Sequence, residues 1–407
     1  MWKLTTYFLE KDEMNRDLIL LLVIGGLYSL GIFLSNTFVN VFLWRQTNDF
    51  LTIANYNLAI FIFQPITFII AGKLAKKIDR IIVLRLGVTF LSIFFLTVLI
   101  IGDHASTYNF LLGCLLGVGY GFYWLAFNVL TFEITEPETR DFFNGFMGGL
   151  ESLGGMIGPV LAGAIISKLK TNIGYMTIFS ISFGLFILAV ICSFFIKRRN
   201  AEGKYGLLTV IREMRENKNW NNVIKSNIFQ GMREGLFVFI VTIWIFLVTK
   251  SEFAIGMFNL CLSAFSFIFY LLVTKIINPN MRKKAIFIGS LIISFSVYII
   301  LFDLTYVHLI IYAIIIGIGY PIINVPFNSM AYDVIGTSKY AKELRIEYVV
   351  ALEIFVNIGR VFSILIFIIS MSIYKNPNII PILLGIFSNT YLFIFIFMNK
   401  VRLTYQK

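Results

Sequence analysis

The sequence predicts an all-α integral membrane protein, with twelve transmembrane helices in two pseudo-symmetric six-helix bundles. Apolar residues make up 58% of the 407-residue chain and charged residues only 14%, whereas soluble domains carry about a quarter charged residues. A repeat also runs through the chain in one direction, since Gly117-Val118-Gly119-Tyr120 returns about 200 residues later as Gly317-Ile318-Gly319-Tyr320. Parallel repeats in a chain this apolar indicate two halves of one membrane protein, with a site between them.

Twelve stretches are long and apolar enough to cross a bilayer, because a span needs about 20 mostly apolar residues. We expect them at residues 18–44, 50–74, 82–102, 107–133, 142–167, 173–196, 222–249, 252–275, 284–303, 306–333, 344–372 and 378–399. The first is too long for a cleaved signal and lacks a small-residue cleavage site. The expected halves are residues 1–196 and 222–407. A linker over 197–221 joins them and includes an amphipathic helix that we expect on the membrane surface.

The distribution of Lys and Arg indicates the orientation. If the N-terminus lies in the cytoplasm, 27 of the 34 basic residues fall on cytoplasmic segments. This asymmetry fits the positive-inside rule. It predicts a multi-pass protein of a bacterial inner (cytoplasmic) membrane, with both termini in the cytoplasm.

The same charge distribution limits the partners and the chemistry. The net charge of +12 is spread over short separate loops, which argues against nucleic acid as a partner. The spans contain neither a nucleophile–base set nor metal-ligand spacing, so we expect no enzyme, no metal and no cofactor. We expect a monomer that contacts membrane lipid, a small-molecule substrate and protons.

Twelve spans in two halves with a basic central loop resemble the major facilitator superfamily. The most specific local match is Gly154-Gly155-Met156-Ile157-Gly158-Pro159-Val160-Leu161-Ala162-Gly163, which resembles the superfamily's antiporter motif with Ala162 as its one departure. Glycines at this spacing let a neighbouring helix approach closely, and Pro159 allows a bend. The resemblance implies an exporter-like transporter in which Gly154, Gly158 and Pro159 belong to the gate. Generic packing of small residues is the alternative.

The segment from Gly72 to Arg80 resembles the family's loop motif, whose acid helps to latch the cytoplasmic side. Lys76 stands where that acid is expected, so the latch here must be rebuilt or weak. Other gating candidates are Asp79, Arg80, Glu133, Arg140 and Asp333. The acids Glu133 and Asp333 are better explained by ion pairs at helix ends than by proton transfer. The family's proton-coupling arginine is missing near Gly113, so the resemblance does not imply proton coupling.

Polar side chains inside the spans are costly in lipid and are therefore expected to face a cavity or a partner. Glu353 and Arg360 share one helical face but are two turns apart, so we expect no direct ion pair without bending. The candidates for substrate binding are Asn36, Asn40, Tyr120, Trp124, Asn128, Gln230, Arg233, Tyr320, Asn324, Asn328, Asn357 and Arg360. Aromatic walls with amides and a few charges suit a small amphiphilic organic molecule. Hydrogen bonding between helices and snorkelling of charges are the structural alternatives.

The candidates for proton coupling are Glu151, Glu353 and Glu234, in that order. Glu151 is first because no cation lies near it in the sequence. We therefore expect a secondary active transporter that works by alternating access and exports an amphiphilic molecule in exchange for protons. The alternatives are a lipid or glycolipid flippase of the same fold, and a membrane sensor that transports nothing.

Overall fold

The computed structural model describes residues 16–134, 137–169, 171–197 and 203–402, with side chains except at 132–145 and 171. Twelve spans in this part of the chain are long and apolar enough to cross a membrane, which confirms the predicted fold class. The first six are α2 (Arg16–Thr47), α3 (Phe50–Lys77), α4 (Arg80–Ile101), α5 (Asn109–Ile134), α6 (Pro137–Lys168) and α7 (Thr171–Ser193). After the short α8 (Leu207–Glu213) follow α9 (Lys218–Thr249), α10 (Glu252–Ile276), α11 (Arg282–Phe302), α12 (Tyr306–Gly336), α13 (Arg345–Tyr374), α14 (Ile379–Ser388) and α15 (Thr390–Met398).

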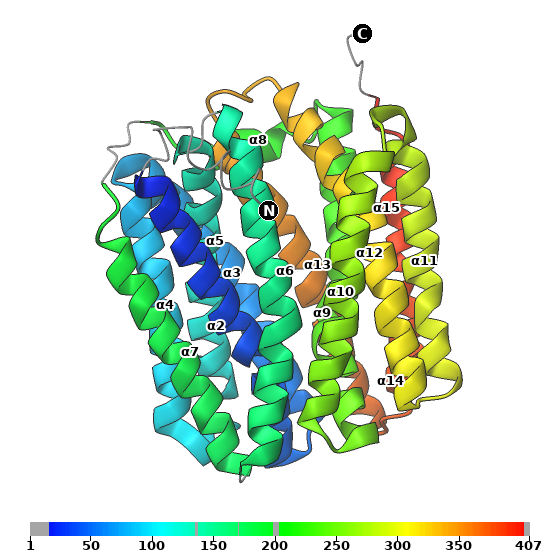
Figure 1. The fold of residues 1–407 in the computed structure, drawn as a ribbon. Coiled ribbons are helices and arrows are strands. Elements are labelled where there is room, and N and C mark those ends of the chain that lie inside the picture. The colour runs from blue at the N-terminus through cyan, green and yellow to red at the C-terminus, as the bar shows by residue number, and fades with distance from the viewer. Residues whose placement is uncertain (1–15, 135–136, 170, 198–202, 403–407) are drawn as a thin grey trace, which may run out of the picture.

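The helices run side by side, with α2–α7 forming one group and α9–α15 the other (Figure 1). The short helix α8 lies at the upper end of the bundle in Figure 1. We call this the linker end, and the opposite end the far end. The main contacts between the two groups are those of α3 with α13, α6 with α10 and α2 with α9.

Tight turns connect the spans because capping residues stop and restart the helices within a few positions. At the turn from α2 to α3, Asn48 adopts a left-handed conformation (φ 50°), and the Asp49 carboxylate then accepts hydrogen bonds from the Leu51 and Thr52 amides. Ser251 caps α10 in the same way, after Lys250 (φ 52°) ends α9. Such caps satisfy amide groups that the first helical turn leaves unpaired.

The twelfth span lies where it was predicted, but its helix is interrupted between α14 and α15. The Ser388 hydroxyl donates to backbone carbonyls of α11, while the Asn389 side chain donates to the Gly385 carbonyl. Thr390 Oγ1 donates to the Phe387 carbonyl at 2.7 Å. These side chains compete with the backbone for carbonyl acceptors, and such competition bends or interrupts helices.

The linker helix α8 also differs from its prediction. Leu207 and Val210 are buried, the Trp220 indole donates to the Val210 carbonyl at 3.1 Å, and Tyr348 of α13 donates to Glu213. The apolar face of α8 therefore packs on α9 and α13. The expectation that this face lies on the membrane surface is wrong, because a protein surface covers it instead.

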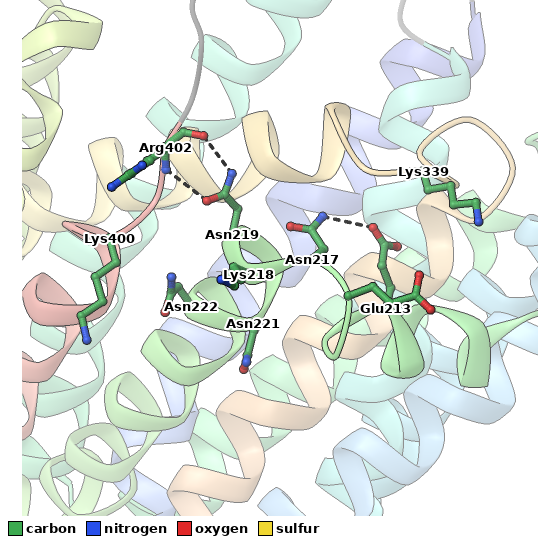
Figure 2. A pocket seen from close by; sticks show the side chains of 10 residues that line it. Glu213, Asn217, Lys218, Asn219, Asn221, Asn222, Lys339, Lys400 and Arg402 are labelled. Carbon is green, nitrogen blue, oxygen red and sulfur yellow. Dashed lines mark hydrogen bonds between the residues drawn. The ribbon is translucent and has the colours of Figure 1, made fainter.

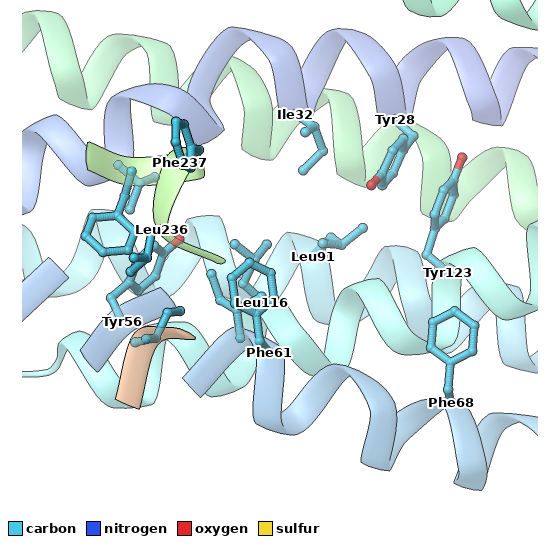
Figure 3. Close-up of a cluster of buried hydrophobic side chains, with 14 of the residues drawn as sticks. Tyr28, Ile32, Tyr56, Phe61, Phe68, Leu91, Leu116, Tyr123, Leu236 and Phe237 are labelled. Carbon is cyan, nitrogen blue, oxygen red and sulfur yellow. The ribbon is translucent and has the colours of Figure 1, made fainter. Parts of the chain in front are cut away.

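An apolar core fills the first group of helices and extends across the seam. Figure 3 shows Tyr56 of the first group with Leu236 and Phe237 of α9 at one end of the cluster, and Tyr28 beside Tyr123 at the other. The rings of Tyr28 and Tyr123 stack with centroids 3.8 Å apart. Aromatic packing of this kind holds neighbouring helices in register.

Candidate central binding site

A cavity of about 490 Å³ lies between the two groups of helices. The first group contributes Thr37, Phe61, Gln64, Tyr120 and Trp124 to its lining. The second contributes Arg233, Glu234, Phe237, Val238, Val241, Thr242, Phe258, Asn259, Leu262, Tyr312, Ile316 and Arg360. Its size is in the range typical of small-molecule sites. Because both groups line it, movement of one group against the other would change its shape.

An ion pair between α9 and α13 forms one wall of this cavity. The Arg360 guanidinium contacts Glu234 Oε2 at 2.7 Å through one terminal nitrogen and at 3.2 Å through Nε. Glu234 Oε1 also accepts hydrogen bonds from Gln230 at 2.9 Å and from Tyr320 at 3.0 Å. The Glu234 carboxylate therefore has several donors and a cation within the protein itself.

Glu353 connects the two groups of helices at the level of the cavity. Its Oε1 atom accepts from Gln64 Nε2 of α3 at 2.6 Å and from Asn357 Nδ2 at 2.9 Å. The same atom lies 3.8 Å from an Arg360 nitrogen. The expectation that Glu353 and Arg360 would not pair is therefore wrong. Helical side chains point toward the helix N-terminus, so the long Arg360 side chain reaches back along α13 toward Glu353.

Arg233 has a different environment, although it neighbours Glu234 in the sequence. One terminal nitrogen donates to the Tyr312 hydroxyl at 2.9 Å. The guanidinium carbon lies 4.1 Å from the Phe237 ring centroid and 5.2 Å from that of Tyr391. The residue is only 4% exposed and its buried Nε atom has no hydrogen-bond partner. Successive helical residues point about 100° apart, which separates this cation from the Glu234 network.

The structure brings together seven of the twelve predicted substrate-binding residues. Tyr120, Trp124, Arg233 and Arg360 line the cavity, while Gln230, Tyr320 and Asn357 hydrogen-bond with its charged residues. Asn40 instead accepts a 2.8 Å hydrogen bond from Asn57, as the helix-packing alternative expects. The other four lie outside the cavity lining, namely Asn36, Asn128, Asn324 and the exposed Asn328.

Glu151 lies half-buried on α6, outside the lining of the central cavity. Tyr28, Tyr123 and Tyr270 lie within electrostatic range of its carboxyl group. Within the part of the chain that the structure describes, no side chain forms a hydrogen bond or ion pair with Glu151. Of the three predicted proton-coupling acids, Glu151 is therefore the one without a paired cation.

Sequence reasoning missed several residues of the cavity wall. Tyr312 and Ile316 precede Tyr320 on α12 at four-residue spacing, toward the N-terminus of the helix. Phe237 and Val241 follow Arg233 at the same spacing. Residues four apart share a helical face. Following the faces of Tyr320 and Arg233 for two further turns would therefore have found these residues.

An ion pair across the α3–α13 seam closes the linker end. Lys76 Nζ contacts Glu347 Oε1 at 2.6 Å, and their side chains are 10% and 0% exposed. Lys76 also donates to the carbonyls of Glu343 at 2.9 Å and Lys204 at 3.2 Å. Glu347 additionally accepts from the Gly206 amide at 2.9 Å. We call Lys76 and Glu347 the latch. In this pair the cation lies on α3 and the acid on α13.

The other predicted gating residues have different positions. Asp79 caps α4 by accepting a 2.8 Å hydrogen bond from the Ile81 amide, so it does not replace the missing latch acid. Arg80 lines a basic cavity of about 560 Å³ at the linker end. Asp333 pairs with Arg282 of α11 at 2.6 Å, as the helix-end alternative expects. The side chains of Glu133 and Arg140 lie outside the described residues.

A second ion pair joins the two groups at the far end. Arg45 of α2 contacts Glu252 of α10 at 2.8 Å, and Glu252 also accepts from the Tyr175 hydroxyl at 3.0 Å. The Arg45 guanidinium lies 4.9 Å from the Phe246 ring centroid of α9. The two ends of the seam are therefore each held by one cation and one acid from opposite groups.

The glycine motif of α6 forms close crossings with two helices. A Cβ atom on Gly158 would lie 3.0 Å from the Leu34 amide nitrogen of α2. One on Gly163 would lie 2.6 Å from the Glu252 carbonyl, and one on Gly256 of α10 would lie 2.6 Å from the Pro159 carbonyl. Gly154 also faces α2, at Phe33. The motif therefore lets α6 approach α2 in its own group and α10 in the other.

A cavity of about 910 Å³ at the linker end lies outside this arrangement (Figure 2). Its lining includes Asn217, Lys218 and Lys400, and Asn219 exchanges hydrogen bonds with the Arg402 backbone at 2.8 and 3.1 Å. Figure 2 shows these polar side chains around the start of α9 and the end of the chain. The residues that line the cavity are polar or charged and come from the linker and the second group, with none from the first group.

Comparison with protein families gives a match over most of the chain. The model described as Major Facilitator Superfamily matches residues 21–363. "Uncharacterized protein YqgE" of Bacillus subtilis (strain 168) is 51% identical over 390 residues, which cover 96% of this chain and 91% of that protein. "Uncharacterized protein in sodM 3'region" of Geobacillus stearothermophilus is 66% identical over 169 residues, covering 42% of this chain and 79% of that protein.

Solved structures of low sequence identity share the fold. The E. coli fucose:proton symporter FucP (N162A) has a TM-score of 0.65 at 14% identity, covering 95% of this chain and 98% of that chain. A POT family transporter in complex with 5-aminolevulinic acid has a TM-score of 0.73 at 11% identity, covering 95% and 96% of the two chains. These similarities support the overall arrangement of the helices.

Proposed function

The chain belongs to the Major Facilitator Superfamily, and from this membership and its central cavity we propose that it exports a small amphiphilic organic molecule in exchange for protons. Membership of this family and fold implies secondary transport rather than catalysis. The observation that carries the proposal is a 490 Å³ cavity lined by both groups of helices and lying on the seam between them. Aromatic walls with a few charged groups suit an amphiphilic molecule.

The ion pairs at the two ends support alternating access. Lys76–Glu347 holds the linker end and Arg45–Glu252 holds the far end. In the proposed cycle, the halves 1–196 and 222–407 rock about the cavity, so that one pair separates while the other stays closed. The linker end faces the cytoplasm of a bacterial cell in this proposal, because Lys and Arg gather on that side.

Glu151 is the proposed proton-coupling residue, with Glu353 second. Protonating Glu151 breaks no ion pair within the described residues, whereas Glu234 is held by Arg360. Glu353 links the two groups through Gln64, so a change of its charge would act directly on the seam. The antiporter-like glycines one turn beyond Glu151 support export. A structural neighbour described as a fucose:proton symporter shows that this fold can use protons.

The test uses purified protein in liposomes that contain a trapped pH-sensitive dye. An inward-acid gradient is applied with a panel of cationic, zwitterionic and anionic amphiphiles. We expect substrate-triggered proton movement that is lost in Glu151→Gln and retained in the control Glu216→Gln, which alters an exposed acid of the linker. Proton movement that persists unchanged in Glu151→Gln would assign the coupling to another acid, with Glu353→Gln as the next variant.

A flippase for lipids or glycolipids is the second candidate, because the charges of the cavity lie in one half. Arg233, Glu234 and Arg360 come from the second group of helices, while the first group contributes mainly aromatic and amide side chains. A head group could bind on one side while an apolar chain lies on the other. The absence of any proton signal with the amphiphile panel, together with transfer of a fluorescent lipid between leaflets, would favour this candidate.

A further inference from the structure

The cavity contains one buried cation, Arg233, that forms no ion pair within the described residues. Arg233 is 4% exposed, and within the described part of the chain no carboxylate lies at ion-pair distance from it. Its only hydrogen bond runs to the neutral Tyr312 hydroxyl, and its Nε atom is buried without an acceptor. Burying a charge without a counter-ion is costly. The Phe237 and Tyr391 rings offset only part of that cost through cation–π contact.

The second arginine of the cavity provides an internal comparison. Arg360 contacts Glu234 at 2.7 Å and Glu353 at 3.8 Å, so two acids gather around one cation. Neither acid is available to Arg233, because Glu234 Oε1 is taken by Gln230 and Tyr320, and Glu353 Oε1 by Gln64 and Asn357. Among the described residues Arg233 therefore has no direct ion-pair partner.

The remainder of the wall indicates what accompanies such an anion. Phe237, Val241 and Ile316 lie on the second group of helices, and Phe61 and Trp124 face them from the first. These surfaces are aromatic or branched aliphatic, so they favour an apolar body of matching size. A guanidinium presents donors in a planar fork that matches a carboxylate.

We propose that the central cavity binds a small organic monoanion, with its carboxylate on Arg233 and its apolar body against the aromatic wall. The anion would accept hydrogen bonds from the terminal nitrogens of the guanidinium, since the Nε atom is buried within the protein. It would thereby give Arg233 the direct ionic partner that it lacks among the described residues. This inference rests on the proposed function for its transport role, but binding itself can be measured without transport.

The first experiment compares three molecules of nearly the same shape that differ in charge, namely phenylacetate, phenylacetamide and phenethylammonium. Binding to the purified full-length protein is followed by quenching of tryptophan fluorescence, since Trp124 lines the cavity. We expect saturable binding of phenylacetate, and at least roughly tenfold weaker binding of the amide and the amine. Branched aliphatic acids such as 4-methylpentanoate extend the acid series.

Variants then assign the anion to Arg233. Arg233→Met is expected to weaken acid binding by roughly 30-fold or more, because the hydrogen-bonded charge pair is lost. Arg233→Lys keeps the charge without the fork and should bind with intermediate affinity. The control Lys250→Met removes an exposed cation at the end of the same helix and should bind phenylacetate as the wild type does.

The outcomes separate this inference from the proposed function. Preference for the amine, absence of saturable binding with every acid, or unchanged acid binding in Arg233→Met and Arg233→Lys overturns the anion site. Arg233→Lys preserves this test if Arg233→Met does not elute as a folded protein. If acids bind through Arg233 but no amphiphile is moved across liposomes, the anion site stands and the transport proposal fails. If amines are moved and Arg233 variants move them equally well, transport stands and the anion site fails.

Discussion

Removing the lysine of the latch should open the linker end. In Lys76→Met, Glu347 remains fully buried and keeps only the Gly206 amide as a partner among its contacts in the closed arrangement. Breaking a buried ion pair from one side costs about 3–5 kcal/mol. The ratio of closed to open linker ends should therefore fall by roughly 150- to 4,000-fold. The open state escapes the cost because water reaches Glu347 there.

The second half of the test removes both charges. In Lys76→Met/Glu347→Met an apolar contact replaces the ion pair, and such replacements of buried pairs are often neutral. The population of the closed arrangement should return close to its wild-type value. The free energy of closure should differ from the wild type only by about 0.5–1.5 kcal/mol, for the hydrogen bond that the Gly206 amide loses. The double-mutant cycle then measures the interaction between the two residues.

Distances between spin labels report the opening. Lys77 at the end of α3 and Lys342 before α13 are exposed on opposite sides of the seam, so cysteines introduced at these two positions carry the labels. The native cysteines Cys114, Cys192 and Cys261 are replaced beforehand. We expect longer distances in Lys76→Met and wild-type distances in the double variant. Identical distance distributions in wild type and Lys76→Met would refute the view that this pair holds the linker end.

Two further predictions concern the far end, and labels at Lys168 and Lys250 report on both. Glu252→Gln should open this end, because Arg45 loses its carboxylate partner. Hydrogen bonds to charged groups contribute about 1.5–3 kcal/mol. Unchanged distances between the labels would show that the Arg45–Glu252 pair does not close the far end. Gly256→Ala should separate α6 from α10, because its Cβ would lie 2.6 Å from the Pro159 carbonyl and overpacking costs about 1–3 kcal/mol. Gly336→Ala is its control, since nothing lies within 4 Å of that position, and equal distances in the two variants would contradict the close crossing.

The spans could be predicted from the sequence because apolar length alone decides whether a segment crosses a bilayer. The interruption of the last span could not, because it depends on Ser388 meeting carbonyls of α11 that lie 94 and 95 residues away. The same limit applies to α8. Its apolar face was visible in the sequence, but only the folded chain shows that protein rather than lipid covers it.

The candidate site shows the same division between local pattern and tertiary contact. Four-residue spacing puts Tyr120 and Trp124 on one helical face, and both side chains line the cavity. The pairing of Arg360 with Glu234 joins residues 126 apart, and that of Lys76 with Glu347 joins residues 271 apart. No periodicity within one helix contains such information. The resemblance to the family marked position 76 as unusual, but its partner required the fold.

The contacts of α3 with α13 suggest how the central site can act on the linker end. Gln64 and Lys76 both lie on α3, while Glu353 and Glu347 both lie on α13. Each helix is continuous between its two contacts, so a tilt of one group against the other changes both contacts together. A substrate or a proton that alters Glu353 would therefore change the balance at the latch through rigid movement of two helices. This coupling needs no chain of intermediate side chains, because a shared two-state movement is sufficient.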